Sequence, residues 1–232
     1  MKLLTTSNSK IEKSKKLGYI TYGMHLSPAD KSGYNVCPNA SEGCRDACLD
    51  TAGMGSFSNV QKARIEKTLF FFRERKAFLD QLWKEVNSAI KSAARKDMIP
   101  CFRLNLTSDL PFHVIKRNGE TILEAFPDVQ FYDYTPDPKR FTQFLEGLLP
   151  NNYHLTFSRK EDKQALCDSV LASGGNVATV FRNILPSKWK GFDVVDGDDT
   201  DLRFLDPKNV IVGLVEKGKA KKDDSGFVVE VA

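Results

Sequence analysis

Short β-forming runs alternate with helical segments through most of this 232-residue sequence, and this alternation restricts the fold more than any other feature. The β-forming runs are residues 19–26, 101–106, 129–134, 153–157, 176–181, 192–195 and 210–215. The spacing of apolar residues predicts helices over 58–96, 138–149 and 160–172. Strands separated by helices favour one parallel sheet with right-handed crossovers, so we expect an α/β protein.

The number of strand–helix units bears on how such a sheet closes. About six units are too few for an eightfold barrel and fit a partial or small α/β barrel of about six parallel strands. A doubly wound open sheet is the alternative, because periodicity does not distinguish the two. No repeat or linker divides the chain, so we expect a single α/β domain over residues 18–232. The Lys- and Ser-rich residues 1–17 are expected to be flexible.

Composition excludes several classes of protein. Lys and Arg number 34 and Asp and Glu 30, and the resulting net charge of +4 is too small by itself to identify a nucleic-acid binder. Apolar runs such as 69–72 and 210–212 are far shorter than the roughly 20 residues that a membrane helix needs. The N-terminus lacks the apolar segment of a secretory signal. We therefore expect a cytoplasmic protein with no membrane partner.

A long loop over residues 29–55 follows the first predicted strand and holds three of the five cysteines, Cys37, Cys44 and Cys48. Crowded thiols in a cytoplasmic chain favour metal chemistry over disulfides. The paired short spacings of structural zinc sites are missing, which favours a 4Fe–4S cluster with one iron left open. Zinc and three free thiols are the alternatives. His25, at the end of the first strand, is the candidate fourth ligand.

Polar side chains follow most of the predicted strands, where parallel α/β folds place their functional groups. The candidates for a substrate or cofactor rim are Asn105, Ser108, Asp109, Tyr134, Ser158, Arg159, Arg182, Asn183, Asp196 and Asp198. Any one of them also fits an ordinary turn or helix cap. Arg159 and Arg182 each directly follow an apolar strand, and a guanidinium group there favours a carboxylate or phosphate. We expect a small anionic or nucleotide-like ligand.

A basic stretch near the C-terminus indicates a second class of function. It contains Lys217, Lys219, Lys221 and Lys222, and the arginines of the long helix, Arg64, Arg73 and Arg75, are candidates to extend it. Such a patch attracts phosphate groups, although a solvated run of charge has the same composition. The alternative function is therefore a zinc- or cluster-stabilised nucleic-acid-binding module without catalysis.

Three separated segments carry a family resemblance. CPNASEGCRDACLDTAG at residues 37–53, DGDDTDLRFLDP at 196–207 and VGLVEKGKAKKDDSGF at 212–227 together resemble the bacteriophage gene product 88 domain family. The resemblance runs from about Gly18 to the C-terminus. It implies a phage origin, and hence the cytoplasm of an infected bacterial host, more than it implies a function.

The chain is also loosely similar to radical S-adenosylmethionine enzymes, which place a three-cysteine loop after the first strand of a partial α/β barrel. This resemblance implies that the open iron binds S-adenosylmethionine. The spacing Cys37-x6-Cys44-x3-Cys48 departs from the usual CxxxCxxC, and Asn105, Thr107 and Ser108 stand where a Gly-Gly-Glu-like segment is expected. The function expected is a phage-encoded iron–sulfur protein, a radical-S-adenosylmethionine-like enzyme acting on a small anionic or nucleotide-like substrate.

Overall fold

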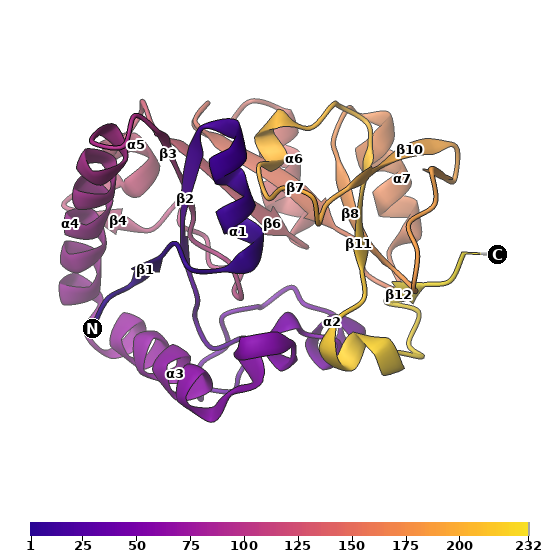
Figure 1. Ribbon diagram of the computed structural model, residues 1–232, viewed down its shortest axis with the longest axis horizontal. Helices are drawn as coiled ribbons and strands as arrows, with labels where there is room; N and C mark the ends of the chain where they lie inside the picture. Colours follow the sequence, from indigo (N-terminus) through magenta and orange to yellow (C-terminus); the bar gives the residue numbers. More distant parts are fainter. Residues whose placement is uncertain (232) are drawn as a thin grey trace.

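Ten strands form one mostly parallel sheet in the computed structural model, which describes residues 1–231 (Figure 1). Residue 232, the last of the predicted domain, lies outside the described residues. The sheet has the order β1-β2-β3-β6-β7-β8-β11-β10-β9, and β12 also pairs with β8. Its strands are β1 Leu4–Thr5, β2 Tyr19–Met24, β3 Ile99–Arg103, β6 Gln130–Thr135, β7 Tyr153–Ser158, β8 Val177–Phe181, β9 Lys188–Trp189, β10 Phe192–Asp196, β11 Ile211–Val215 and β12 Val228–Val229.

All seven predicted strands are present, as β2, β3, β6, β7, β8, β10 and β11. A separate hairpin, β4 Lys116–Arg117 and β5 Glu120–Thr121, lies outside the main sheet. The helices are α1 Ser9–Glu12, α2 Glu42–Asp46, α3 Ser58–Arg73, α4 Arg75–Ala94, α5 Ile122–Ala125, α6 Pro138–Leu145 and α7 Gln164–Ala172. The long predicted helix breaks at Glu74, whose φ of −129° and ψ of 50° are not helical.

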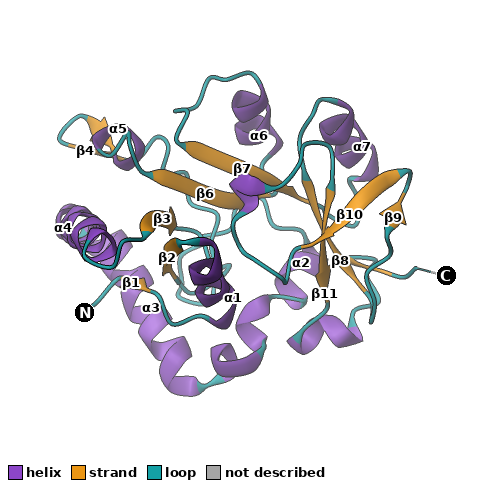
Figure 2. Ribbon diagram, turned by 45° about the horizontal axis from the view of Figure 1, so that its top comes forward, coloured by secondary structure: helices purple, strands orange, loops and turns teal. Residues whose placement is uncertain are grey.

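The parallel strands follow one another across the sheet nearly in chain order. β2, β3, β6, β7 and β8 are successive parallel neighbours, and only β10 and β11 exchange places at the far end. A doubly wound sheet reverses its order at a central switch point, so the strand order rules out that alternative. Figure 2 shows the strands following an arc, with α4, α5, α6 and α7 on its outer side and α1 on its inner side.

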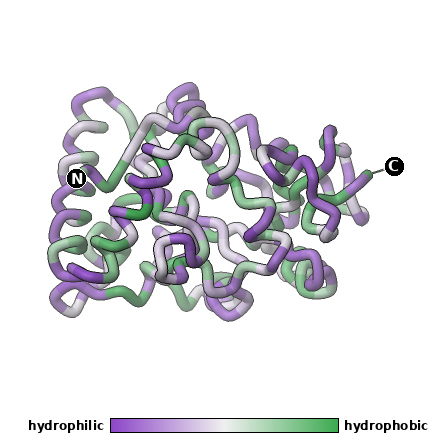
Figure 3. Tube along the Cα trace, turned by 90° about the horizontal axis from the view of Figure 1, so that it is seen from below, coloured by the Kyte–Doolittle hydropathy of each residue, from purple (hydrophilic) through white to green (hydrophobic). Residues whose placement is uncertain are grey.

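The outer side of the arc holds the main apolar core. Tyr22, Phe102 and Phe131 stand at paired positions of β2, β3 and β6, and their rings stack 5.4 and 5.3 Å apart. The buried face of α4 covers this side with Phe78 and Leu82, among others. Hydrophobic and hydrophilic positions alternate along the helices in Figure 3, as expected for helices with one buried face.

Residues 1–17 differ from the flexible segment expected, because they pack into the fold. β1 pairs antiparallel with β2, and Leu3, Leu4 and Ile11 are almost completely buried. The backbone N–H groups of Leu3 and Leu4 donate to the Glu85 carboxylate of α4. The lysine-rich composition gave no sign of these few apolar anchors, which are enough to fix the segment.

A buried carboxylate joins α1 to the inner side of the sheet. Asp201 is fully buried and accepts hydrogen bonds from Arg103 Nη1 at 3.0 and 3.1 Å and from Tyr132 OH at 3.0 Å. Lys10 Nζ of α1 lies 3.3 Å from the same carboxylate. Burial opposes ionisation of Asp201, but the charges of Arg103 and Lys10 outweigh it and hold the pKa below its ordinary value.

We expect Asp201→Asn to destabilise the protein strongly, because it leaves Arg103 buried without its counter-charge. Breaking a buried pair in this way costs about 3–5 kcal/mol. Urea unfolding followed by circular dichroism measures the loss. Asp199→Asn, an exposed position two residues away, is the matched control and should stay within about 0.5 kcal/mol of the parent. Equal stabilities for the two variants would contradict the role given to Asp201.

Candidate functional site

The cysteine loop, residues 29–55, crosses the carboxyl ends of the strands. Near β3 it accepts a hydrogen bond at Val36 O from Asp109 N at 2.8 Å. Beyond β7, Glu161 accepts from Ser41 Oγ at 2.6 Å and from Gly43 N at 2.9 Å. The loop therefore bridges two well-separated parts of the sheet edge, and Figure 1 shows it with α2 along that edge.

The three thiols occupy distinct places in this loop. Ser41 caps α2 by accepting from Cys44 N at 3.3 Å, so Cys44 lies within the helix and Cys48 follows one turn later. Cys37 Sγ lies 3.5 Å from Ala29 N and 4.0 Å from Thr107 O. All three are half-buried free thiols.

Burial sets the protonation state of the three thiols. It raises the pKa of Cys44 to about 12, and the negative charges of Cys37 and Glu161 act in the same direction. Burial likewise raises the pKa of Cys48 to about 12, although a backbone hydrogen bond at Asp50 opposes it, and Cys44 adds to the increase. Cys44 is thus within electrostatic reach of both other thiols. At neutral pH the thiols are protonated until a cation displaces the protons.

The donor set suits a soft metal or an iron–sulfur cluster, since three sulfur atoms lie on one loop. Among residues 1–231, however, no three Cys, His, Asp or Glu side chains converge closely enough to hold a metal ion. A metal would therefore have to draw the thiols together. Cys101 and Cys167 are fully buried in β3 and α7, as their sequence positions suggested.

His25 faces cations, not thiols. Its Nδ1 lies 3.4 Å from Thr107 Oγ1. Burial, together with the positive charges of Arg64, Lys67 and Arg103, lowers its pKa to about 3. The neutral imidazole is thus chemically able to bind a metal, but the described chain does not bring it together with the cysteines.

Arg64, expected on a basic surface, lies instead under the cysteine loop. It is only 8% exposed, and no residue in the described chain accepts a hydrogen bond from its Nε or Nη1. A Cβ at Gly55 would lie 3.3 Å from Nη1, so the loop backbone passes close over the guanidinium group. Arg64 and Cys48 are also close enough to influence each other's charge.

Asp50 lies beside this arginine and is almost completely buried. Its Oδ2 accepts from Lys31 Nζ at 2.6 Å, whereas Oδ1 has no hydrogen-bond partner among residues 1–231. Sequence reasoning missed Asp50 and the burial of Arg64, because the charged residues of α3 look alike without the tertiary contacts. The three-cysteine spacing gave the only hint that this loop matters.

Three rim candidates after β3 hydrogen-bond mainly within the protein. Asn105 donates to Leu110 O at 3.0 Å and accepts from Ser108 Oγ at 2.8 Å, which shapes the turn. Asp109 pairs with Arg140 Nη1 at 2.9 Å, and both side chains are buried. Asp109 is also among the charges that raise the pKa of Cys37 and Cys44, so this group lies beside the cysteine loop.

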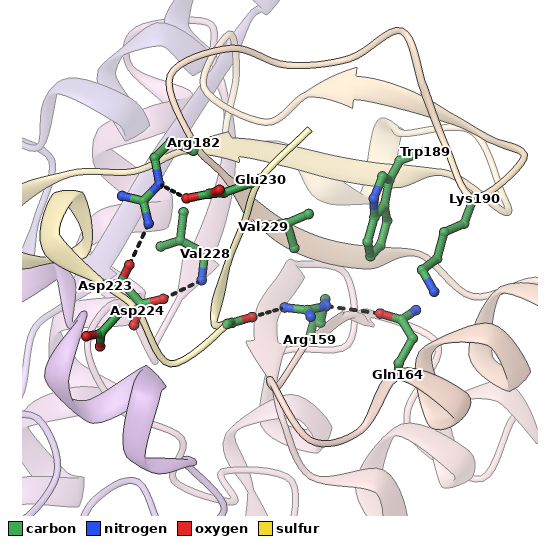
Figure 4. Close-up of a pocket in the computed structure, with 11 residues that line it drawn as sticks. Arg159, Gln164, Arg182, Trp189, Lys190, Asp223, Asp224, Val228, Val229 and Glu230 are labelled. Atoms are coloured by element: carbon green, nitrogen blue, oxygen red, sulfur yellow. Dashed lines mark hydrogen bonds and ion pairs between the residues drawn. The ribbon is translucent and has the colours of Figure 1, made fainter. Parts of the chain in front are cut away.

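Arg159 and Arg182 line one open cavity of about 620 Å³ with Trp189 and Lys190 (Figure 4). Arg159 Nη1 donates to the carbonyls of Gly226 and Phe227 at 3.0 and 3.1 Å. The structure therefore brings the two predicted arginines together. We expected Arg159 to bind an external anion, but its guanidinium group hydrogen-bonds the C-terminal segment of the chain instead.

Arg182 fixes the same C-terminal segment at a second place. Its Nη1 donates to Lys221 O at 2.9 Å, its Nη2 donates to Asp223 O at 2.5 Å, and its Nε lies 3.2 Å from Glu230 Oε1. This guanidinium group is thus surrounded by acceptors of its own chain.

The remaining rim candidates lie in other surroundings. Tyr134 faces the inner side of the sheet, with the Arg103 guanidinium 4.4 Å from its ring. Ser158 ends β7 opposite Ala178. Asn183 has a left-handed φ of 60° and donates from its N–H to Glu216. The residues predicted to form one rim therefore lie in separate groups.

Asp196 and Asp198 form one of these groups. Asp196 Oδ1 accepts from the N–H of Asp198 at 2.7 Å, which closes a local turn. Asp198 accepts from Lys217 Nζ at 2.7 Å, so one lysine of the basic stretch is paired. Asp198 also lies near Lys13, which donates to its carbonyl. These contacts stabilise the segment before β11.

Residues 2–231 match the sequence profile of Gene product 88. The chain belongs to this bacteriophage family. The match confirms the resemblance of the three sequence segments. A search of curated proteins found no match to this chain, and a search of solved structures found none either. None of its helices in residues 1–231 is long and apolar enough to cross a bilayer.

We expect Arg182→Lys to loosen the C-terminal segment, because lysine cannot donate to Lys221 O and Asp223 O in the two-pronged geometry of arginine. Losing one or two such bonds costs about 1–2 kcal/mol locally, so trypsin should cleave at Lys217–Lys222 about tenfold faster. Arg73→Lys, at an exposed position of α3, is the control and should be cleaved at the parent rate. Unchanged cleavage of Arg182→Lys would show that this arginine does not hold the segment.

Proposed function

We propose that this family member is a phage-encoded iron–sulfur protein whose 4Fe–4S cluster is held by Cys37, Cys44 and Cys48. The observation that carries the proposal is the placement of three half-buried free thiols on one loop after the first parallel strand, with Cys44 in α2 and Cys48 one turn later. Burial keeps the thiols protonated and unreactive in the absence of metal, as suits ligands that a metal must deprotonate. Its site of action is the cytoplasm of the infected host.

The strand order supports a partial α/β barrel around this site. The parallel strands succeed one another in an arc, helices lie outside it, and the cysteine loop follows the first parallel strand. Radical S-adenosylmethionine enzymes also place a three-cysteine loop after the first strand of a partial α/β barrel, although with another cysteine spacing. We therefore propose a radical-S-adenosylmethionine-like enzyme, in which Cys37, Cys44 and Cys48 would hold a cluster that would supply an electron for the reaction.

Iron is favoured over zinc by the number of available donors. A structural zinc site takes four protein ligands. The cysteine loop supplies three sulfur atoms, and the candidate fourth ligand, His25, does not converge with them in the described chain and lies instead by Thr107 Oγ1 at 3.4 Å. Three ligands leave one position open for a ligand, which suits a catalytic cluster.

The cavity beside Arg159 supports an anionic or nucleotide-like substrate. Lys190 lines it and forms no ion pair with any described residue, and its Nζ lies over the Trp189 ring. The half-buried ring of Trp189 packs edge-on against Phe181 at 5.6 Å, and the cations of Arg159 and Lys190 lie 5.7 and 5.5 Å from its centre, so this wall of the cavity is positively charged and suits a phosphate or carboxylate. Arg182 contributes by ordering the C-terminal segment that forms one wall.

Anaerobic purification tests the metal assignment. The parent protein should be brown and contain iron and sulfide in equal amounts. Cys44→Ala should lose the cluster, because two thiolates hold it poorly. Cys167→Ala, which removes a buried thiol of α7, is the control and should keep it. A colourless parent with stoichiometric zinc would replace the cluster with a zinc site, and full iron in Cys44→Ala would refute the ligand assignment.

A separate measurement tests the use of S-adenosylmethionine. Adding it to the reduced protein should change the electron paramagnetic resonance spectrum of the cluster and yield 5′-deoxyadenosine. The spectrum changes because the cofactor's amine and carboxylate occupy the open iron. An unchanged spectrum together with no cleavage product would reject this cofactor while leaving the iron–sulfur assignment in place.

A zinc- or cluster-stabilised nucleic-acid-binding module is the second candidate. It is supported by three exposed lysines, Lys219, Lys221 and Lys222, on the turn Gly218–Lys222. Arg64 is buried and Arg75 lies 3.6 Å over the Phe71 ring, so neither extends the patch. Salt-dependent retention on DNA or RNA would support this function, because phosphate contacts release counterions. Absence of binding at low salt would reject it.

A further inference from the structure

The cavity beside Arg159 is lined by opposite charges from two parts of the chain (Figure 4). The ends of β7 and β8 and the turn after β9 supply three cations, Arg159, Arg182 and Lys190. Residues 223–230, here called the strap, supply three acidic residues, Asp223, Asp224 and Glu230. A site that attracts anions is therefore occupied by an acidic part of its own chain.

Main-chain carbonyls of the strap take up the arginine donors. Arg159 Nη1 donates to Gly226 O and Phe227 O at 3.0 and 3.1 Å. Arg182 Nη2 donates to Asp223 O at 2.5 Å. A phosphate or carboxylate in the cavity would accept hydrogen bonds from the same guanidinium groups. The strap and an anion therefore compete for them.

The strap adds only one short strand to the sheet. Its strand β12 pairs with β8 at two positions, Val228 with Val180 and Val229 with Phe181. Val228 is the one buried residue between positions 223 and 230, and four of the others are exposed. A segment with so little buried surface opens at a much lower free energy than the core of the sheet.

We propose that the strap is a displaceable internal ligand that keeps the anion cavity closed. The inference rests on the proposed anionic substrate and adds the regulation of its site. When the strap leaves, Arg159 and Arg182 exchange the carbonyls of their own chain for the oxygens of a phosphate or carboxylate. The acidic residues of the strap move away from the bound charge at the same time. Anions thus bind more weakly to the protein as a whole than to its open form.

The strap also contacts the cysteine loop, which gives its movement a second consequence. Gly43 of α2 lies so close to it that a Cβ there would meet Ser225 Oγ and would lie 2.8 Å from Phe227 Cβ. Ala47 of the same loop packs against Val228. Displacing the strap uncovers this side of α2, so a ligand in the cavity changes the surroundings of the cysteine loop.

Val228→Ser tests the inference, because it removes the buried side chain of the strap without removing an arginine donor. Binding of pyrophosphate is followed by the fluorescence of Trp189, which lines the cavity, in a Trp83→Phe background that leaves no other tryptophan. Val228→Ser should bind pyrophosphate about tenfold more tightly than the parent, since a larger fraction of the protein is open. Val114→Ser, at an exposed position, is the matched control and should bind as the parent does.

Arg182→Lys separates displacement of the strap from mere loosening. This variant also loosens the strap, but it removes donors that the strap and the anion share. It should therefore bind pyrophosphate about tenfold more weakly than the parent. In the parent protein, saturating pyrophosphate should speed tryptic cleavage at Lys217–Lys222 about fivefold, because the bound anion holds the strap open.

Two results would overturn the inference. Folded Val228→Ser that binds pyrophosphate with parent affinity would show that the strap does not compete with the anion. Unchanged or slower cleavage of the parent with pyrophosphate bound would show that the anion binds beside a closed strap, and this measurement needs no variant. Either result leaves the cavity as an anion site. If neither pyrophosphate nor citrate binds the parent or Val228→Ser, the proposed anionic substrate fails and the inference fails with it.

Discussion

The buried carboxylate of Asp201 determines what the inner side of this sheet can contain. It joins β3 through Arg103, β6 through Tyr132 and α1 through Lys10, all at hydrogen-bonding or ion-pair distance. Because these hydrogen bonds and ion pairs are buried, they hold the three elements in place relative to one another. The inner side is therefore filled by the chain's own α1 and by the segment that carries Asp201. A ligand would have to bind nearer the carboxyl ends of the strands.

At those ends, two remote parts of the chain meet. The cysteine loop contacts the turn Gly218–Lys222, where Lys219 N donates to Thr51 Oγ1, and Ala47 packs against Ala220 and Val228. The same C-terminal segment is held by Arg159 and Arg182. The position of the thiols thus depends on residues nearly two hundred positions away. A metal that draws the thiols together would act on this whole contact, not on the loop alone.

The sequence predicted the strands well because each is a short β-forming run between turn residues, and the two long helices because apolar residues recur at helical spacing. It missed β1 and α1, because the buried residues that hold them, Leu3, Leu4 and Ile11, are few among polar residues and lysines. For the site, the rule that functional groups follow parallel strands singled out Asp109, Arg159 and Arg182. It did not predict which groups these residues hydrogen-bond. Whether an arginine binds a ligand, as expected for Arg159, or a carbonyl of its own chain depends on tertiary contacts. The burial of Arg64 depends on them as well.

The pairing of β12 with β8 has a consequence for the order of events during synthesis. β7 pairs with β8 only as far as Ser158 and Ala178, and β12 takes the adjacent place beside Val180 and Phe181. Residues 218–230 are synthesised after the parallel strands and the cysteine loop, so their contacts with Thr51 and Ala47 form late. Until then, this side of the cysteine loop lacks its cover.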